Sequence, residues 1–279
     1  MVMNGLPLAP TCCGGIEFRW GERTYVMGIL NLTPDSFSGD GLDGDVETAL
    51  VRARRFVADG ADIIDVGGES TRPGSEPVPV DEELRRVIPA VERLAGELAV
   101  PLSIDTYRSA VASRAVEAGA RMINDVWGLR RDPGLARVAA ETGVPLVLVS
   151  NQRDRSCRDI IAGVISDLRW SIALAVQAGV DEANIIIDPG VGFGKTVEQN
   201  LEIIRRLAEL KALGRPVLIG ASRKFMPGRS PDQRLEGTAA AVAIGIAHGA
   251  DMVRVHDVGP MVRVCRMSDA VMRGRRVGD

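Results

Sequence analysis

The sequence predicts a single α/β domain, a (β/α)8 TIM barrel with a short N-terminal hairpin. Eight short apolar segments alternate with longer segments of helical spacing, which is typical of a parallel sheet covered by helices. The 279 residues are the length of one such barrel. An open doubly wound sheet is the less favoured alternative, because no G-x-G-x-x-G motif follows the first predicted strand.

The strands are predicted from short β-branched runs and from the Gly and Pro residues that bound them. Residues 1–15 are rich in Pro and Gly and are expected to form a flexible tail, so the barrel domain is expected to span 16–279. Residues 16–20, with the turn at Gly21, predict the hairpin. The eight strands are expected at 24–30, 62–66, 101–104, 122–123, 145–149, 184–187, 216–219 and 252–257.

The segments between the strands have apolar residues at helical spacing. Gly60 is a typical stop for the first helix, and Pro133 suits the first turn of the fourth. Acidic residues from Asp81 onward favour the N-terminal end of the second helix. The helices are expected at 45–60, 81–97, 108–119, 133–142, 158–179, 197–213, 236–249 and 259–273.

Composition and charge exclude several classes of protein. A net charge of −3 gives no general attraction to nucleic acid or to an acidic membrane. The four cysteines contain no C-x-x-C pair, which argues against structural zinc and a disulfide framework; Cys12 and Cys13 are interpreted as incidental. With no apparent 18-residue apolar span and no secretory signal in residues 1–11, we expect a cytoplasmic protein without membrane contact.

Polar residues close the predicted strands, and the ends of parallel barrel strands meet at one mouth. Asp105, Asn124 and Asp188 supply carboxylates and an amide that suit the edge of a flat heterocycle. A metal cage is an alternative, although two acids and one amide are few ligands for it. Each of the three could instead cap a helix.

A second group of strand-end residues is cationic. Lys224, Arg254 and His256 follow the last two strands, where barrels often hold phosphate. Asn31 could offer one oxygen to Mg²⁺, which usually keeps waters and substrate phosphates as its other ligands. Arg223 could equally be a solvated surface charge.

The run 188–195 resembles a phosphate loop at first sight. It lacks the G-x-x-x-x-G-K-[ST] spacing, so a P-loop is rejected. Its glycines would let the backbone approach a ligand, with Phe193 as a cover. No Ser–His–Asp or Cys–His pattern is evident, so the expected chemistry is electrostatic and positional.

Seven motifs between residues 24 and 272 together resemble the signatures of dihydropteroate synthase. They are NLTPDSFS at 31–38, GGESTRPG at 67–74, SIDT at 103–106, INDV at 123–126, DPGVGFGK at 188–195, SRK at 222–224 and RVHD at 254–257. The resemblance implies an enzyme that joins 4-aminobenzoate to a dihydropterin carrying a methylene diphosphate. Its products would be dihydropteroate and pyrophosphate, on the route to folate, and it would require Mg²⁺.

The resemblance also implies a role for individual residues of this chain. Asn31 would meet the Mg²⁺, and Ser222 would lie beside the aminobenzoate. The pterin would be held by Asp105, Asn124, Asp188 and Lys224, with Phe193 and Gly220 among the binding residues. The diphosphate would meet Thr71, Arg254 and His256. Two mobile loops, with Asp35 and Phe37 in the first and Arg72 and Pro73 in the second, would form the aminobenzoate pocket, and the expected catalytic residues are Asp35, Thr71, Lys224, Arg254 and His256.

Some positions depart from the family pattern. Ser150 follows Val149 where the family usually has a Met-His pair, and the loop after Lys224 is short. Two alternatives to the synthase stay open: a methyltransferase of the same superfamily that moves a methyl group from methyltetrahydrofolate to a corrinoid, and a paralogue that binds pterin without turnover. The resemblance suggests a homodimer, which the apolar faces around residues 239–246 could serve.

Overall fold

The computed structural model describes residues 8–33, 45–70, 75–154, 157–225 and 232–274. Eight strands form one parallel sheet. They are β3 Tyr25–Asn31, β4 Ile63–Gly67, β5 Leu102–Asp105, β6 Met122–Asp125, β7 Leu146–Val149, β8 Ile185–Asp188, β9 Leu218–Ile219 and β10 Met252–Val255. Their spatial order is β8-β7-β6-β5-β4-β3-β10-β9, and a parallel bridge between Ile187 and Val217 joins the two ends of the sheet. The predicted (β/α)8 barrel is therefore confirmed, and the doubly wound alternative is wrong.

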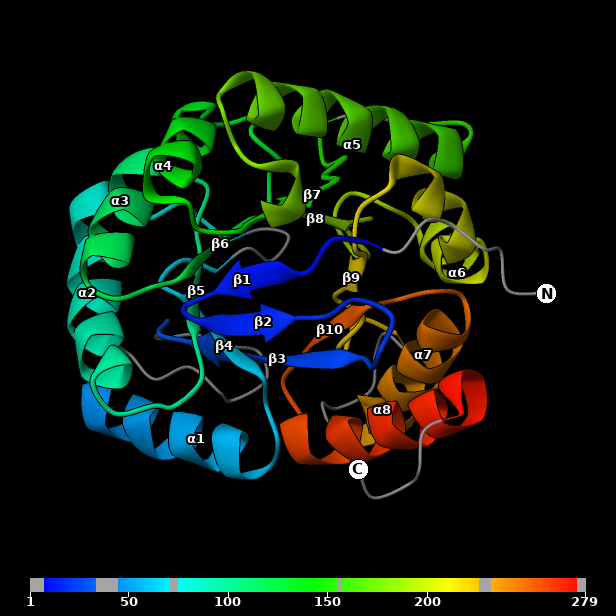
Figure 1. The fold of residues 1–279 in the computed structure, drawn as a ribbon, viewed down its shortest axis with the longest axis horizontal. Helices are drawn as coiled ribbons and strands as arrows, with labels where there is room; N and C mark the ends of the chain where they lie inside the picture. The colour runs from blue at the N-terminus through cyan, green and yellow to red at the C-terminus, as the bar shows by residue number, and fades with distance from the viewer. Residues whose placement is uncertain (1–7, 34–44, 71–74, 155–156, 226–231, 275–279) are drawn as a thin grey trace.

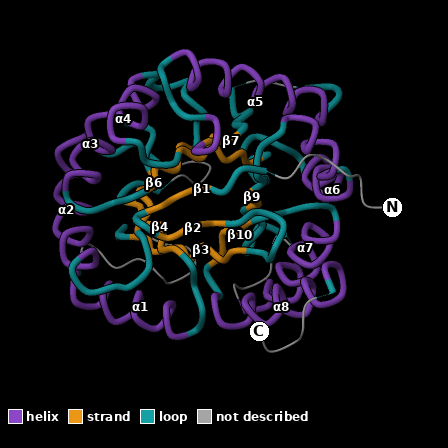
Figure 2. Tube along the Cα trace, in the orientation of Figure 1, coloured by secondary structure: helices purple, strands orange, loops and turns teal. Residues whose placement is uncertain are grey.

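Helices surround the strands as an outer ring (Figure 1; Figure 2 shows them in purple around the orange strands). They are α1 Val46–Ala58, α2 Val80–Ala95, α3 Ser109–Glu117, α4 Gly134–Thr142, α5 Ile160–Gln177, α6 Val197–Arg205, α7 Leu235–Ala247 and α8 Val258–Arg273. Three short 3-10 helices accompany them: η1 Glu182–Asn184, η2 Leu207–Leu213 and η3 Asp232–Arg234. The helix expected at 197–213 is thus divided into α6 and η2.

Two apolar layers hold the barrel together, because successive side chains of a strand point to opposite faces. On β4, Ile64 and Val66 belong to the layer between the strands and the helices, whereas Ile63 belongs to the layer inside the barrel. Met122 and Met252 contribute to the same inner layer. Each large side chain that is fully buried stabilises the fold by about 1.5–3 kcal/mol. The inner layer packs the barrel interior up to the carboxyl ends of the strands, where Val149 belongs to it.

The N-terminal hairpin begins earlier than the sequence predicts. β1 Thr11–Cys13 pairs antiparallel with β2 Ile16–Phe18, so residues 11–15 are not a flexible tail. The hairpin lies across the end of the barrel in Figure 1, and the Trp20 Nε1 donates to Thr11 Oγ1 at 2.9 Å. Cys13 is buried beneath it, and burial raises the pKa of its thiol to about 12. The thiol therefore contributes packing and not reactive chemistry.

α5 is the one described helix that is long and apolar enough to cross a membrane, with a mean hydropathy of 1.4 over 18 residues. No such span was expected from the sequence. The helix belongs to the outer ring and packs on β7 and β8. Ile161, Val164 and Leu168 are buried on its inner side. Its apolar character is therefore explained by the barrel core.

Candidate active site at the barrel mouth

The structure gathers the predicted strand-end residues at the carboxyl end of the barrel, opposite the hairpin. Those within the described residues are Asn31, Asp105, Asn124, Asp188, Phe193, Gly220, Ser222, Lys224, Arg254 and His256. The remaining predicted positions lie outside the described residues: Asp35, Phe37, Thr71, Arg72 and Pro73. The described part of the mouth therefore consists of the strand ends and the loops after β8 and β9.

Arg254 links carboxylates from two other strands inside the mouth. Its Nε donates to Asp65 Oδ2 at 2.6 Å, and its Nη2 donates to Asp105 Oδ2 at 2.5 Å. Asn124 Nδ2 also donates to Asp65 Oδ2, at 3.0 Å. Residues of β4, β5, β6 and β10 thus form one hydrogen-bonded layer above the apolar floor. The Arg254 Nη1 takes part in none of these bonds and remains available to an anion.

Asp65 was not among the site residues predicted from the sequence. Its side chain is completely buried, and it holds both Arg254 and Asn124. The signal was present, because a lone acid interrupts the apolar run Ile63–Val66. Strand period two places that acid on the same face as Ile63, inside the barrel, and a buried carboxylate requires a partner.

The mouth contains more hydrogen-bond acceptors than its own donors satisfy. Two carboxylates face the single guanidinium of Arg254. Among the described residues, Asp65 Oδ1, Asp105 Oδ1 and Ser103 Oγ are buried without a hydrogen-bond partner. Burial raises the pKa of Asp105 to about 7, although Arg254 opposes that shift. Buried polar groups are normally paired, so this layer fits a ligand that presents N–H donors.

The second polar group of the mouth lies at the end of β8. Asp188 Oδ1 accepts from Gly190 N at 2.7 Å, and Lys224 Nζ donates to Val191 O at 2.6 Å. A Cβ at Gly220 would lie 3.7 Å from Asp188 Oδ2 and 3.6 Å from Lys224 Nζ, so these three residues are neighbours. Burial raises the pKa of Asp188, and the charges of Lys224 and Arg254 oppose that shift. Asp188 and Arg254 therefore lie at the same end of the molecule.

Burial also affects Lys224, the cation of this group. Removal from water lowers the pKa of the Lys224 ammonium to about 8, while Asp188 acts in the opposite direction. The Phe193 ring lies 4.6 Å from Lys224 Nζ and 4.8 Å from the Arg153 guanidinium carbon. Phe193 is itself buried beside these two cations, and its role as a cover of a bound ligand stays a prediction.

The loop after β9 is tied to the end of β10. Ser222 Oγ lies 2.9 Å from His256 Nδ1 and accepts from His256 N at 3.1 Å. The Arg223 guanidinium donates twice to Asp257, at 2.9 and 2.7 Å. Arg223 is therefore an ion-pair residue that fixes this loop, which corrects the alternative of a solvated surface charge. Ser222 and His256 reach the mouth as a pair.

Ser150, the departure after β7, turns away from the mouth. Val149 belongs to the inner layer, so the next residue faces the helices. Ser150 Oγ donates to Asp167 Oδ2 on α5 at 3.0 Å, and Arg130 Nη2 reaches the other oxygen of that carboxylate at 3.1 Å. The serine thus belongs to a supporting network behind the strand, and Val149 forms the wall of the mouth.

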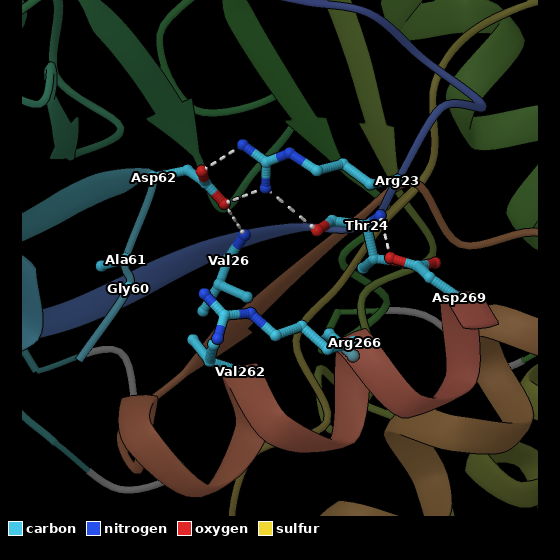
Figure 3. A pocket seen from close by; sticks show the side chains of 10 residues that line it. Arg23, Thr24, Val26, Gly60, Ala61, Asp62, Val262, Arg266 and Asp269 are labelled. Atoms are coloured by element: carbon cyan, nitrogen blue, oxygen red, sulfur yellow. Dashed lines mark hydrogen bonds and ion pairs between the residues drawn. The ribbon is translucent and has the colours of Figure 1, made fainter. Parts of the chain in front are cut away.

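A cavity of about 370 Å³ lies at the opposite end of the barrel (Figure 3). Arg23 donates to Asp62 at 2.5 and 2.9 Å, and Asp269 accepts from both the N–H and the hydroxyl of Thr24, at 2.7 and 2.8 Å. The carboxylates of Asp62 and Asp269 are therefore already paired. These contacts join the strands to α8, so we interpret the cavity as a structural feature and not as a binding site. In the described part of the chain, the buried acceptors without partners belong to β4 and β5 and not to this cavity.

Comparisons with known proteins agree with the site. A family model described as pterin binding enzyme matches residues 27–256. The dihydropteroate synthase of Bacillus subtilis is 52% identical over 255 residues, which are 90% of this chain and 90% of that protein. The chain belongs to the dihydropteroate synthase family of pterin-binding enzymes. Members of this family are transferases of folate biosynthesis, and so is this chain, which excludes the methyltransferase alternative.

Solved dihydropteroate synthases share the fold. The enzyme of Clostridium difficile, solved in the presence of pteroic acid, is 49% identical, with a TM-score of 0.86 over 92% of this chain and 99% of that one. The enzyme of Xanthomonas albilineans, solved with 4-aminobenzoic acid, is 42% identical, with a TM-score of 0.87 over 95% and 98%. The resemblance predicted from the seven motifs is therefore confirmed at the level of family, fold and reaction.

Proposed function

We propose that the chain condenses 6-hydroxymethyl-7,8-dihydropterin diphosphate with 4-aminobenzoate, with the pterin ring held in the polar layer of the mouth. The observation that carries this assignment is the set of buried acceptors without partners on Asp65 and Asp105. The edge of a pterin carries amino and ring N–H groups that such acceptors bind. Asn124, Asp188 and Lys224 would complete the recognition of the ring.

The diphosphate would lie above the ring, where the chain offers cations. The unused Nη1 of Arg254 and the His256 imidazole are the groups proposed to bind it, and an arginine suits phosphate oxygens. The carbon–oxygen bond of the methylene group breaks as the diphosphate leaves, and the arylamine nitrogen forms the new carbon–nitrogen bond and loses a proton. The electron-rich pterin carries the positive charge that develops on the methylene carbon, so a strong general base is not needed.

Mg²⁺ is proposed as the cofactor. The described residues contain no cluster of three or more His, Cys, Asp or Glu side chains, so an all-protein cage does not fit them. Asn31 ends β3 beside Asp105 and could supply one oxygen, which suits an ion that takes its other ligands from water and substrate phosphates. When bound, the ion would neutralise charge on the leaving diphosphate.

The decisive test is complementation of a strain that cannot make dihydropteroate, together with an assay of the purified protein. We expect growth without added folate end-products, and pyrophosphate release that needs both substrates. Binding of the dihydropterin substrate without release of pyrophosphate would instead support a paralogue without turnover. A protein that neither binds the dihydropterin substrate nor releases pyrophosphate would contradict the proposal.

The charge of Lys224 predicts how activity depends on pH. The value of kcat/KM for the dihydropterin substrate should fall as the pH rises through about 8, because the free enzyme then loses the Lys224 ammonium. Lys224→Arg stays charged at every pH of the assay, so its profile should lack this decline. Rates measured over a pH series on both sides of that value check this, and an unchanged decline in Lys224→Arg would assign it to another group.

A homodimer is also proposed, with α7 and α8 at the interface. These helices pack against each other and border a shallow apolar groove that includes Leu235, Ala239, Val264 and Met267. Met267 is 56% exposed, and α7 is apolar on its outer side as well, which favours a covering partner.

The predicted cytoplasmic location is supported by the free cysteines of the described residues.

Met267→Glu should dissociate the proposed dimer, because a charge would be buried in the apolar contact. Light scattering should give about twice the 29.8 kDa of one chain for the wild type and a smaller mass for the variant. Val51→Glu is the matched control, since Val51 is an exposed apolar residue on α1 that does not line the groove. Equal masses for all three proteins would contradict this interface.

A further inference from the structure

A lysine to which the proposed function assigns no role stands inside the glycine-rich loop after β8. Lys195 Nζ donates to three backbone carbonyl oxygens, those of Ser150 at 2.7 Å, Gly190 at 3.0 Å and Phe193 at 3.2 Å. An ammonium group has three donors and no acceptor, so it suits such a set of carbonyls. These bonds join the end of β7 to two points of the loop.

The loop lies so close to the chain after β7 that a side chain would clash at two of its glycines. Gly190 has a φ of +69°, and a Cβ at this position would lie 2.0 Å from Ser150 O. A Cβ at Gly194 would lie 2.3 Å from Arg153 N. The carbonyl dipoles of Ser150, Gly190 and Phe193 converge at this contact. Without the ammonium they would repel one another and lose their shared donor.

Three groups of the mouth depend on the position of this loop. Gly190 N donates to Asp188 Oδ1 at 2.7 Å, and Val191 O accepts from Lys224 Nζ at 2.6 Å. The Phe193 ring lies 4.6 Å from the same ammonium of Lys224. A shift of the loop would therefore move the carboxylate, the cation and the aromatic cover together.

We infer that Lys195 is a positioning residue for pterin recognition, which holds the loop 188–195 on the end of β7 so that Asp188, Phe193 and Lys224 meet the ring in one arrangement. It acts through backbone carbonyls and does not touch the reacting atoms. This inference rests on the proposed function, because it names the residue that organises one wall of the same site. Misplacement of binding groups by about 1 Å can cost about 100-fold in rate.

The test compares Lys195→Met, which keeps the apolar stem, with Lys195→Arg, which keeps a charge and donors. We expect Lys195→Met to raise the Kd of the dihydropterin diphosphate, measured by calorimetry with Mg²⁺ and without aminobenzoate, by about tenfold or more. The KM for the aminobenzoate substrate should change much less than that. Lys195→Arg should recover part of the pterin affinity.

The folding of the variants is controlled in two ways. Asn200 Oδ1 accepts from Gly192 N at 2.8 Å, so the loop keeps a second attachment when Lys195 is replaced. Lys211→Met is the matched control, because Lys211 pairs with buried Asp251 at the other end of the barrel. It should lower the thermal midpoint without changing the Kd of the pterin. If Lys195→Met does not fold, the order of Kd among wild type, Lys195→Arg and Lys195→Gln carries the same test.

The outcomes separate this inference from the function on which it rests. A wild type that binds and turns over, beside a Lys195→Met variant with unchanged pterin Kd, overturns the positioning role and leaves the proposed function intact. A lower thermal midpoint with unchanged Kd has the same meaning, because it reduces Lys195 to a stabilising residue. A wild type that does not bind the pterin substrate rejects both.

Discussion

Replacing Asp188 by alanine is expected to abolish measurable binding of the dihydropterin substrate while the barrel stays folded. The carboxylate is buried at the end of β8, where Gly190 N orients one oxygen and the other faces Gly220 and Lys224. Truncating one partner of a buried, charged hydrogen-bonded pair costs about 2–5 kcal/mol of binding free energy. Calorimetry with the diphosphate substrate measures that loss.

The thermal stability of Asp188→Ala provides the second half of this prediction. Burial raises the pKa of Asp188, so the empty protein keeps its carboxylate in an unfavourable environment. The thermal midpoint of the variant should therefore equal or exceed that of the wild type. Asp188→Asn is the matched control, because it keeps an acceptor for Gly190 N but no charge, and it should retain intermediate affinity. Full affinity in Asp188→Ala would refute the role of Asp188 in pterin binding.

Replacing Arg254 by leucine is expected to remove activity and to destabilise the protein. The change leaves the buried carboxylates of Asp65 and Asp105 without their common cation. Loss of one partner from a buried ion pair costs about 3–5 kcal/mol in the free energy of unfolding. In the same variant, the proposed diphosphate site loses its arginine, so kcat/KM should fall by about 100-fold or more.

The destabilisation of Arg254→Leu should depend on pH. Burial already raises the pKa of Asp105 to about 7, and the loss of Arg254, which opposes that shift, raises the pKa further. A carboxyl with a raised pKa in the folded state is neutral and tolerated at low pH, and its contribution to stability is lost as the pH rises. Urea unfolding should therefore show a larger loss at about pH 8 than at about pH 5.

Arg23→Leu is the control for this experiment. Arg23 also makes two contacts with carboxylate oxygens, both on Asp62, but at the opposite end of the barrel and with a more exposed side chain. Its loss should destabilise the protein less than the loss of Arg254 and should leave kcat/KM unchanged. Equal losses of stability for both variants at both pH values would contradict the buried cluster described for Arg254.

The common location of the strand-end residues could be predicted from the sequence. Asp105, Asn124, Asp188 and Arg254 each follow an apolar run, and the parallel order of the strands brings such ends to one mouth whatever the details of packing. Their common location was predictable for that reason, and the structure bears it out. Their roles toward the pterin and the diphosphate remain predictions, as do those of Asp35, Phe37, Thr71, Arg72 and Pro73.

Other contacts could not be predicted because they depend on elements that are far apart in sequence. Nothing in the residues near Ser150 shows that its hydroxyl turns to Asp167, or that Lys195 reaches back to its carbonyl oxygen. The hairpin strand Thr11–Cys13 was mistaken for a tail, since its short run beside two glycines has no periodicity of its own. It becomes ordered through burial of Cys13 and the bond between Trp20 and Thr11.

The sequence by itself determined the barrel, the end of it at which polar and charged side chains gather, and the chemical character of that end. Hydrophobic periodicity and the order of polar strand ends are local properties, which the chain carries wherever its elements finally pack. The tertiary structure decided which charges are shared: that Asp65 and Asp105 divide one arginine, and that a lysine collects three carbonyl oxygens. Pairing of buried charges depends on distances across the barrel, and only the closed sheet sets those distances.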